Sequence, residues 1–599
     1  MAHASVLEYY LENAATIGDR TAALVKTDGH YRAHTWQQLV DQSRQIAAVL
    51  VQAGVVAGDR VSIIAHTRLE WVTADMGIVW AGAVTVPIYP SNLADECQYI
   101  IADSGAVVVF SENAGQSAKF IAERARLPGL RRVIQIDGEL PAGAGDWVVS
   151  LAAALAAAPV DAAVLEERRR GLNKDSMLTI TYTSGTTGQP KGVVTTHDNM
   201  IYEAEAVAEI NIMSESDVQM LFLPLAHVFA RVAEVAWIRL RHVLAFAENM
   251  QTLRGNLQEV RPSLMAGVPR VFEKFYSAVV HRGQSAGGLR GRLFSQALRL
   301  SEKQGAAELI GEKLHGVDAL AFAVLKKLVF AKVGRGLQEA LGGNMRLMIS
   351  GAAPLSPRIA FFFRDAGITL LEGFGLTETS AASCVNRLER NSIGSVGWPV
   401  PGTEMKLAED GELMLRGRGI MRGYWGRPEA TQEVLRDGWF YTGDIGQVQP
   451  DGSMRIIDRK KDIIVTAGGK KIAPQKLENL IKTAHLISQV VLHGDRRNFL
   501  TALITLDPEA LRAWAEEHGL AAIDLTALSQ HEAVLQAVAE VMAGFNAQLA
   551  SYETVKKFKI LDHDFSVENG ELTASLKMKR RLIAERYRAV FDAFYDDQF

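Results

Sequence analysis

Apolar and polar positions follow two different rhythms over the first third of the chain. Residues 37–52 carry apolar side chains at helical spacing directly after Thr35 and Trp36, and a threonine is a favoured helix N-cap, so a capped amphipathic helix is predicted. Three short apolar runs, at residues 61–65, 84–89 and 106–110, predict buried strands with helix-like segments between them. Strands separated by helices pair in parallel, because a parallel crossover needs a long connection. The main body is therefore predicted to be α/β.

Three further predicted strands end in segments that suit ligand binding. Residues 178–183 run into a loop rich in glycine and hydroxyl side chains. Residues 345–349 end at a Ser-Gly-Ala-Ala-Pro segment, and residues 368–371 end at the segment Glu372–Glu378. Open α/β sheets bind ligands beyond the carboxyl ends of their strands, so these three exits are expected to converge on one crevice.

A long stretch between about residues 280 and 344 is predicted to be helical, after a flexible lead-in at 283–288. Within it, residues 319–331 are apolar apart from Lys326 and Lys327. Such a segment can lie against a bilayer surface, although packing on its own domain is the more common outcome.

Length and composition restrict the classes of protein that fit. A chain of 599 residues is too long for one ordinary core, so at least two domains are expected. The formal net charge of −4 gives no global field for nucleic acid, and two cysteines, Cys97 and Cys384, offer no disulfide framework. No secretory signal is recognised, and the longest apolar stretch, residues 76–89, is shorter than the ~20 residues of a membrane span. A soluble, cytoplasmic protein without a nucleic-acid partner is expected.

The loop from Tyr182 to Gly192 has the composition of a phosphate-binding segment. It contains four aliphatic hydroxyls, three glycines and Lys191 within eleven residues. Glycines let backbone N–H groups approach a phosphate, hydroxyls donate to its oxygens, and a lysine adds a mobile positive charge. The loop is not a Walker A motif, because Lys191 follows Pro190 and precedes Gly192 instead of a Ser or Thr. An isolated Gly-Thr-Thr-Gly turn would often be only structural.

This loop resembles the signature of the AMP-forming, adenylate-forming enzymes, which include acyl-CoA synthetases, luciferases and peptide-synthetase adenylation domains. Further motifs of that family follow in order, and the similarity runs from about residue 20 to about residue 585. They are the segments at residues 372–378, 437–444, 458–462, 468–469 and 472–478. The resemblance implies a large multi-subdomain N-terminal α/β domain and a small, mobile α+β C-terminal domain. We predict the AMP-binding domain at 1–458, with the helical insert at about 280–344, and the mobile domain at 459–599, because the charged run at 458–462 suits a boundary.

The resemblance assigns roles to individual residues. It implies ATP or AMP binding by Thr183, Ser184, Gly185, Thr186, Thr187, Gly188, Lys191, Gly351, Ala352, Glu372, Gly373, Phe374, Gly375, Thr377, Asp444, Arg459 and Lys577. It implies Mg²⁺ ligation by Glu378 and Thr186, a hinge at Lys461, and a CoA tunnel lined by Gly468 and Gly469.

Several of these roles also make chemical sense by themselves. Phe374 offers a flat apolar face for adenine, where the family more often has Tyr, although a core position is the alternative. Asp444 can accept hydrogen bonds from both ribose hydroxyls, as acidic residues do in dinucleotide folds. Glu378 is a hard oxygen ligand of the kind that Mg²⁺ on phosphates takes.

The segment at residues 572–581 resembles the one that carries the mobile catalytic lysine of the family. Lys577 is the predicted lysine, but Leu576 stands where the family has Gly, so Lys579 stays open as the alternative. Lys577 and Lys191 would stabilise negative charge during catalysis.

The segment at residues 223–231 resembles the family's entry to the acid pocket. It places His227 near the carboxylate, as a catalytic or structural group, with Val228 and Phe229 in the acyl pocket. Ala230 stands where the long-chain branch often has Glu.

The resemblance predicts ATP-dependent activation of a carboxylic acid through an acyl-adenylate to its CoA thioester, with ATP, Mg²⁺ and coenzyme A taking part. The helical insert and residues 221–229 favour a long-chain fatty acid. Three alternatives stay open: an acyl-AMP ligase that loads a carrier protein, an aryl acid–CoA ligase, and an inactive nucleotide- or lipid-binding protein. A homodimer and a peripheral membrane contact are also left open.

Overall fold

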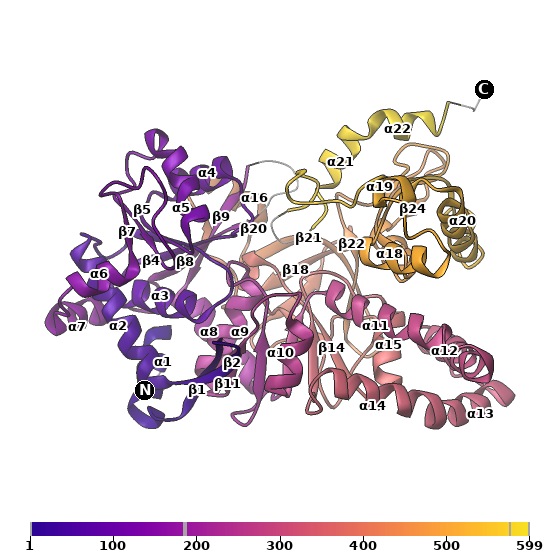
Figure 1. Cartoon of the computed structure of the whole chain (residues 1–599), viewed down its shortest axis with the longest axis horizontal. Coiled ribbons are helices and arrows are strands. Elements are labelled where there is room, and N and C mark those ends of the chain that lie inside the picture. The colour runs from indigo at the N-terminus through magenta and orange to yellow at the C-terminus, as the bar shows by residue number, and fades with distance from the viewer. Residues whose placement is uncertain (1–2, 184–188, 574–576, 597–599) are drawn as a thin grey trace.

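The computed structural model describes residues 3–183, 189–573 and 577–596 of the chain (Figure 1). Two large sheets and a smaller antiparallel sheet form the N-terminal part, and a three-stranded sheet with its helices forms the C-terminal part. The predicted α/β body with a small α+β second part is confirmed.

The first large sheet contains the strands predicted near the N-terminus. Its order is β19-β9-β8-β4-β3-β5-β6-β7. The strands are β3 (Arg60–Ile64), β4 (Val84–Ile88), β5 (Ala106–Ser111), β6 (Arg132–Gln135), β7 (Val148–Ser150), β8 (Met177–Thr183), β9 (Lys191–Thr196) and β19 (Gly423–Tyr424). β3 pairs in parallel with β4 and β5, as predicted. The intervening helices are α3 (Leu69–Trp80), α4 (Ala94–Ser104) and α5 (Ala114–Ala122).

The second large sheet has the order β16-β15-β14-β13-β12-β10-β11-β1-β2. Its strands are β1 (Thr21–Thr27), β2 (His30–Thr35), β10 (Val218–Leu221), β11 (Val243–Phe246), β12 (Leu264–Gly267), β13 (Leu347–Ser350), β14 (Thr369–Phe374), β15 (Cys384–Val385) and β16 (Trp398–Pro399). β13 and β14 lie here, whereas β8 belongs to the first sheet. The three predicted strand exits therefore come from two sheets, because hydrophobic patterning reports that a strand is buried and not which sheet it joins.

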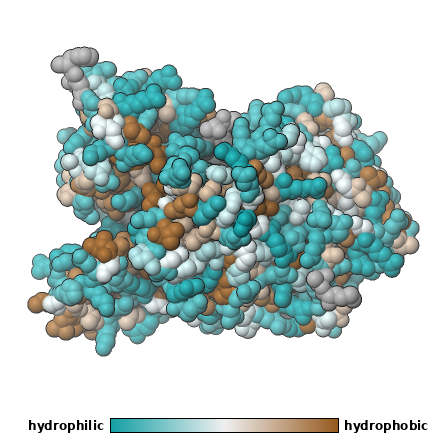
Figure 2. Space-filling model, turned by 180° about the vertical axis from the view of Figure 1, so that it is seen from behind, coloured by the Kyte–Doolittle hydropathy of each residue, from teal (hydrophilic) through white to brown (hydrophobic). Residues whose placement is uncertain are grey.

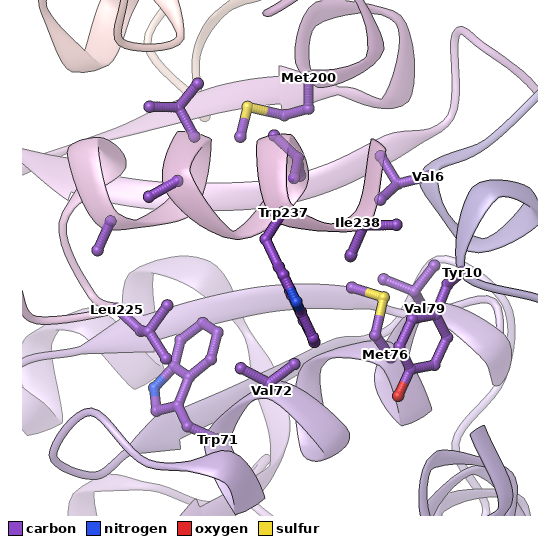
Figure 3. Close-up of a cluster of buried hydrophobic side chains, with 14 of the residues drawn as sticks. Val6, Tyr10, Trp71, Val72, Met76, Val79, Met200, Leu225, Trp237 and Ile238 are labelled. Atoms are coloured by element: carbon purple, nitrogen blue, oxygen red, sulfur yellow. The ribbon is translucent and has the colours of Figure 1, made fainter. Parts of the chain in front are cut away.

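Helices between the two sheets form the main hydrophobic core. They are α1 (Val6–Ile17), α2 (Trp36–Gln52), α3, α8 (His197–Glu209) and α9 (Val228–Leu240). In Figure 3, Trp237 of α9 points toward Trp71 and Val72 of α3. The Trp237 ring also stacks on Trp36 with centroids 4.7 Å apart. The predicted cap of α2 is present, since Thr35 Oγ1 accepts from the Gln38 backbone N–H while the Gln38 side chain accepts from Thr35 N–H, worth ~1 kcal/mol.

A five-stranded antiparallel sheet follows the second large sheet along the chain. It contains β17 (Glu404–Leu407), β18 (Glu412–Arg416), β20 (Leu435–Arg436), β21 (Trp439–Val448) and β22 (Met454–Arg459). The predicted domain boundary at 458/459 falls on the last two residues of β22, so Arg459 is still paired to β21.

The stretch predicted as a helical insert forms a run of helices. It comprises the end of α11 (Pro269–Gln284), then α12 (Gly288–Glu308), α13 (Gly316–Leu325), a π-helical turn (Lys326–Phe330) and α14 (Ala331–Ala340). Phe322 and Phe330 pack into a second core with Phe362 of α15 (Pro357–Asp365).

The C-terminal part has a core of its own. Its strands are β23 (Ile464–Val465), β24 (Lys471–Ile472), β25 (Ile487–His493), β26 (Leu500–Leu506) and β27 (Val555–Ile560), and its helices are α17 (Pro474–Ile481), α18 (Pro508–Glu517), α19 (Leu525–Ser529), α20 (Glu532–Asn546), α21 (Arg580–Arg586) and α22 (Arg588–Ala593). Its contact with α11 is polar: Arg270 Nη2 lies 2.9 Å from Asp507 Oδ2 and His281 Nε2 lies 3.2 Å from Glu517 Oε1. Interfaces between domains that move are of this polar kind.

Candidate active site

The glycine-rich loop connects two antiparallel strands. Thr183 at the end of β8 is paired with Lys191 at the start of β9, so the loop closes a hairpin. The hairpin base is fixed from α4, where Tyr99 donates from its hydroxyl to the Pro190 carbonyl at 2.9 Å. A Walker A loop joins a strand to a helix, so this connection agrees with the sequence argument against that motif. Five of the predicted phosphate ligands, Ser184, Gly185, Thr186, Thr187 and Gly188, lie outside the described residues.

Tyr424 joins the phosphate-loop lysine to the predicted metal ligand. The Lys191 ammonium lies 5.0 Å from the centroid of the Tyr424 ring, and the Tyr424 hydroxyl donates to Glu378 Oε1 at 2.9 Å. Burial and the nearby Glu378 carboxylate both raise the pKa of Tyr424, so it stays a donor at neutral pH. Sequence reasoning missed this residue, because only the pairing of β19 with β9 brings it beside Lys191.

The segment from Glu372 to Glu378 turns sharply at the end of β14. A Cβ atom on Gly375 would lie 1.1 Å from the Ala381 carbonyl oxygen, so only glycine fits this close approach of two backbone segments.

The other predicted residues of this segment lie around that turn. Phe374 is half-buried against a small core that includes Cys384 and Leu415, so part of its ring serves packing. Gly373 is paired with Val385, and Thr377 begins the short 3₁₀ turn Thr377–Thr379 that carries Glu378. Burial raises the pKa of Glu372 to about 8.

Asp444 and Arg459 form a cross-strand pair between β21 and β22. Arg459 Nε lies 2.9 Å from Asp444 Oδ1, while Asp444 Oδ2 is buried and has no hydrogen-bond partner among the described residues. Burial raises the pKa of Asp444 to about 6, and the positive charges of Arg459 and Lys577 limit that rise. A buried carboxylate oxygen without a partner is costly unless a ligand supplies a donor, so this atom is a ready acceptor.

Lys577 lies in the electrostatic reach of the same groups. Desolvation, followed by the positive charge of Arg459, lowers the pKa of Lys577 to about 8, and Glu378 and Asp444 oppose that shift. Its backbone is held by Thr573, whose N–H donates to the Lys577 carbonyl at 2.8 Å. Lys579 instead has its ammonium 4.0 Å from Glu96 Oε1 on α4. Of the two candidates, the structure brings Lys577 to the predicted nucleotide residues.

His227 caps the N-terminus of α9. Its Nδ1 accepts from the Phe229 backbone N–H at 3.1 Å, which implies that the neutral ring carries its proton on Nε2. Desolvation, and then the charge of Lys577, lowers the pKa of His227 to about 3, so the ring is neutral. Phe229 contacts the segment after β13: a Cβ on Gly351 would lie 3.1 Å from its ring, and Ala352 bends with a φ of 68°. Val228, by contrast, is buried in the main core.

The predicted hinge and tunnel residues follow β22. Lys461 is the second residue after β22, and partial burial of its ammonium together with the charge of Arg459 lowers its pKa. Gly468 and Gly469 form the exposed turn of the β23–β24 hairpin. That hairpin is tied to the C-terminal sheet, because Ala467 N–H donates to the Arg497 carbonyl at 2.9 Å. In this arrangement the charge of Lys577 acts on Asp444 and His227, two of the predicted site residues.

Comparison with protein families agrees with this geometry. Residues 11–425 match the model of the AMP-binding enzymes, and residues 461–599 match that of the AMP-binding enzyme C-terminal domain. The chain belongs to the AMP-binding enzyme family. The family and fold predicted from the sequence are thereby confirmed, as is the prediction that the chain is an enzyme.

Individual members of the AMP-binding enzyme family are similar over nearly the whole chain. The long-chain-fatty-acid–CoA ligase FadD15 of Mycobacterium bovis is 37% identical, over 95% of this chain and 94% of its own. A peroxisomal long chain acyl-CoA synthetase of Arabidopsis thaliana is 32% identical, over 96% and 83%. Among solved structures, the A domain of a carboxylic acid reductase from Segniliparus rugosus, in complex with AMP and a carboxylic acid, matches with a TM-score of 0.75 at 22% identity, over 99% of this chain and 94% of that one. At that identity the structural match supports the fold alone.

Proposed function

We propose that this protein activates a long-chain fatty acid with ATP and transfers the acyl group to coenzyme A, releasing pyrophosphate and then AMP. One observation carries the proposal: charged groups from separate segments, Lys191, Glu378, the Asp444–Arg459 pair and Lys577, gather around one place. Relatives named as a long-chain-fatty-acid–CoA ligase and a long chain acyl-CoA synthetase, 37% and 32% identical over most of the chain, support the choice of reaction.

In the first half-reaction the fatty acid carboxylate attacks the α-phosphate of ATP and pyrophosphate leaves. Phosphoryl-type transfer depends on positioning and electrostatics more than on covalent catalysis. The ammonium groups of Lys577 and Lys191 would stabilise the developing charge. Asp444 would accept the ribose hydroxyls through its partnerless Oδ2, while Arg459 holds Oδ1.

The residues present also fit Mg²⁺, which the family uses with ATP. Among the residues with described positions, no group of three or more His, Cys, Asp or Glu side chains could hold a metal by itself. Mg²⁺ on phosphates takes only one or two protein carboxylates, so a single one suffices. Glu378 would hold the ion, with Thr186 as the second predicted ligand, and the ion when bound would neutralise phosphate charge.

In the second half-reaction the thiolate of coenzyme A attacks the acyl carbonyl carbon and AMP leaves. We propose that the C-terminal domain first rotates about Lys461, so that the Gly468–Gly469 turn replaces Lys577 at the site. The polar contact of this domain with α11 supports such a movement, because pairs such as Arg270–Asp507 regain hydration when they separate. One mobile domain would thus serve both half-reactions.

The acyl group would enter past His227 and Phe229. A neutral His227, with its proton on Nε2, can donate to the carboxylate without adding a charge that Lys577 already supplies. Phe229 and the half-buried Phe222 offer apolar surface next to it.

A single substrate panel tests the proposal. Fatty acids of increasing length and aromatic acids are incubated with ATP, and with either coenzyme A or an acyl carrier protein, while pyrophosphate, acyl-AMP and thioester are quantified. We expect CoA thioesters of long-chain acids. Acyl-AMP that accumulates with free CoA would favour the carrier-loading alternative, a preference for flat aromatic acids would favour an aryl ligase, and no acid-dependent pyrophosphate release would indicate an inactive binding protein.

No helix among the described residues is both long and apolar enough to cross a bilayer. The cytoplasmic location and the homodimer stay predictions from the sequence.

A further inference from the structure

The outer face of α13 and the π-helical turn carries a row of exposed aliphatic side chains, which we call the apolar row. It consists of Val317, Leu320, Val324 and Leu328, whose exposed fractions are 84, 70, 50 and 65%. Spacings of three and four residues place the four on one side of the helix. The other side supplies Phe322, Leu325 and Phe330 to the core, so packing of the insert is already complete without the row.

Exposed apolar side chains are concentrated in this region of the molecule. Of seventeen large apolar side chains that are exposed among the described residues, seven lie between residues 289 and 328. The other three are Leu289 and Leu293 near the start of α12 and Ile310 just after its end. Figure 2 shows hydrophobic side chains at the lower left corner of the molecule. Because that view is from behind, this corner is the lower right end in Figure 1, where α13 is labelled. Exposed apolar side chains gathered in one region are typical of an interaction site.

The same segment is basic within a chain that is acidic overall. Residues 280–344 contain ten Lys and Arg against five Asp and Glu, a net charge of +5, whereas the whole chain carries −4. Three of the five acidic side chains pair with basic ones: Glu302 with Arg358, Glu308 with Arg364, and Asp318 with Lys303. The insert also exposes seven basic side chains: Arg290, Arg292 and Arg299 on α12, Lys313 before α13, Lys327 in the π-helical turn, and Lys332 and Arg335 on α14.

We propose that this surface docks on a bilayer that contains anionic lipids. The apolar row would enter the boundary of the acyl chains, and the flanking basic side chains would meet the headgroups, as an amphipathic helix does when it lies in the membrane plane. The positive charge of the insert is complementary to anionic lipid headgroups and therefore favours a membrane as the partner. A second copy docked face to face would bring two segments of net charge +5 together, and that repulsion disfavours a symmetric dimer through this face.

Docking at a membrane surface does not depend on the proposed reaction, since it rests on the row and its charge alone. If the proposed function also holds, the enzyme would sit where long-chain acids partition. The π-helical turn supports a role for the segment, because such turns recur at functional sites, and here it lies within the row.

Flotation of the full-length protein with lipid vesicles tests the proposal. The vesicles are pure phosphatidylcholine, or phosphatidylcholine with about one third phosphatidylglycerol. We expect flotation with the anionic vesicles, weakened by salt, and little with the neutral ones. We expect each of two triple variants to bind the anionic vesicles at least about tenfold more weakly than the wild type. The variants are Leu320→Ser/Val324→Ser/Leu328→Ser and Lys327→Gln/Lys332→Gln/Arg335→Gln.

A matched control replaces exposed aliphatic residues elsewhere. Val448→Ser/Leu535→Ser removes two exposed aliphatic side chains outside the insert, with exposed fractions of 47 and 38%, and is expected to float like the wild type. Pyrophosphate release with a water-soluble acid should be unchanged in all variants, which separates this test from that of the reaction. The proposal is overturned if the wild type fails to float with anionic vesicles, or if both triple variants float as well as it does. It is also overturned if the row instead mediates a dimer in lipid-free solution that the Ser variant abolishes.

Discussion

The hydroxyl of Tyr424 donates a 2.9 Å hydrogen bond to Oε1 of Glu378, across 46 residues of sequence, while the ring of Tyr424 faces the ammonium of Lys191. One aromatic side chain therefore fixes the distance between the predicted metal ligand and the predicted phosphate lysine. We propose that Tyr424 is a positioning residue that orients both groups before ATP binds.

Replacing Tyr424 by Phe should weaken ATP use. Hydrogen bonds to charged groups contribute roughly 1.5–3 kcal/mol, so we expect kcat/KM for ATP to fall about tenfold or more, with a higher Mg²⁺ concentration needed for half-maximal rate. Pyrophosphate release measured over ATP and Mg²⁺ concentrations checks this. Tyr31→Phe is the control, because it also removes a 2.9 Å hydrogen bond, to the Phe246 carbonyl. Tyr31 lies on β2, the edge strand at the opposite end of the second large sheet from β14, which leads to Glu378. Equal loss in both variants would mean a general effect on stability.

The mobile lysine should matter for one half-reaction only. Lys577→Ala is expected to slow adenylation by at least about a hundredfold, since electrostatic groups at such sites contribute roughly 3–4 kcal/mol, and to spare thioester formation from supplied acyl-AMP. Lys579→Ala should change neither step much, because its partner is Glu96 at the surface. If Lys577→Ala slows both half-reactions equally, the assignment of the lysine is wrong.

The pH dependence of adenylation follows from the same lysine. Lys577 has its pKa lowered to about 8, so the ammonium is present below pH 8 and is lost as the pH rises through that value. We expect the rate of acyl-AMP formation to fall between about pH 7.5 and 9. Arg459→Gln removes a positive charge that lowers this pKa and should move the fall to higher pH. A single-turnover measurement of acyl-AMP over this range would reveal a flat profile if Lys577 were not involved.

ATP binding should also weaken in acid. Asp444 has its pKa raised from an ordinary 3.8 to about 6, so its carboxylate is ionised at pH 7 and becomes protonated as the pH falls through 6. Because an ionised carboxylate is the stronger acceptor, we expect KM for ATP to rise between pH 7 and pH 5. Asp444→Asn should remove this dependence and leave a raised KM at every pH. A dependence that persists in Asp444→Asn would point to another group.

The turn that carries Glu378 should tolerate no side chain at Gly375. A methyl group there would lie 1.1 Å from the Ala381 carbonyl oxygen, so Gly375→Ala must displace one of the two backbones. We expect a loss of about 2 kcal/mol or more in the free energy of unfolding, with weakened ATP binding. Gly336→Ala on α14 is the control, as a Cβ there meets no atom within 4 Å, and it should be neutral or slightly stabilising. Denaturant unfolding with and without ATP measures both effects.

The sequence by itself determined the elements and the chemistry of the site. The strands at β3, β4, β5, β8, β13 and β14 and the cap at Thr35 were predicted to within two or three residues, because period and capping depend on neighbours along the chain. The motifs that carry Lys191, Glu378, Asp444 and Arg459 identified the family, since residue types at fixed spacing define the ligand chemistry.

Only the tertiary structure decided how these parts meet. Local periodicity cannot say that β8 and β13 join different sheets, that Tyr424 reaches Glu378 through the pairing of β19 with β9, or that Lys577 and not Lys579 lies near Arg459. Residues 319–331 illustrate the same limit of local sequence patterns. Their apolar pattern predicted a helix, but which of its faces the core covers depends on α15 and the second core, far away in sequence, and this left Leu320 and Val324 exposed. Burial is a property of contacts between distant segments, and for that reason the sequence pattern alone could not distinguish a core helix from one with a free apolar face.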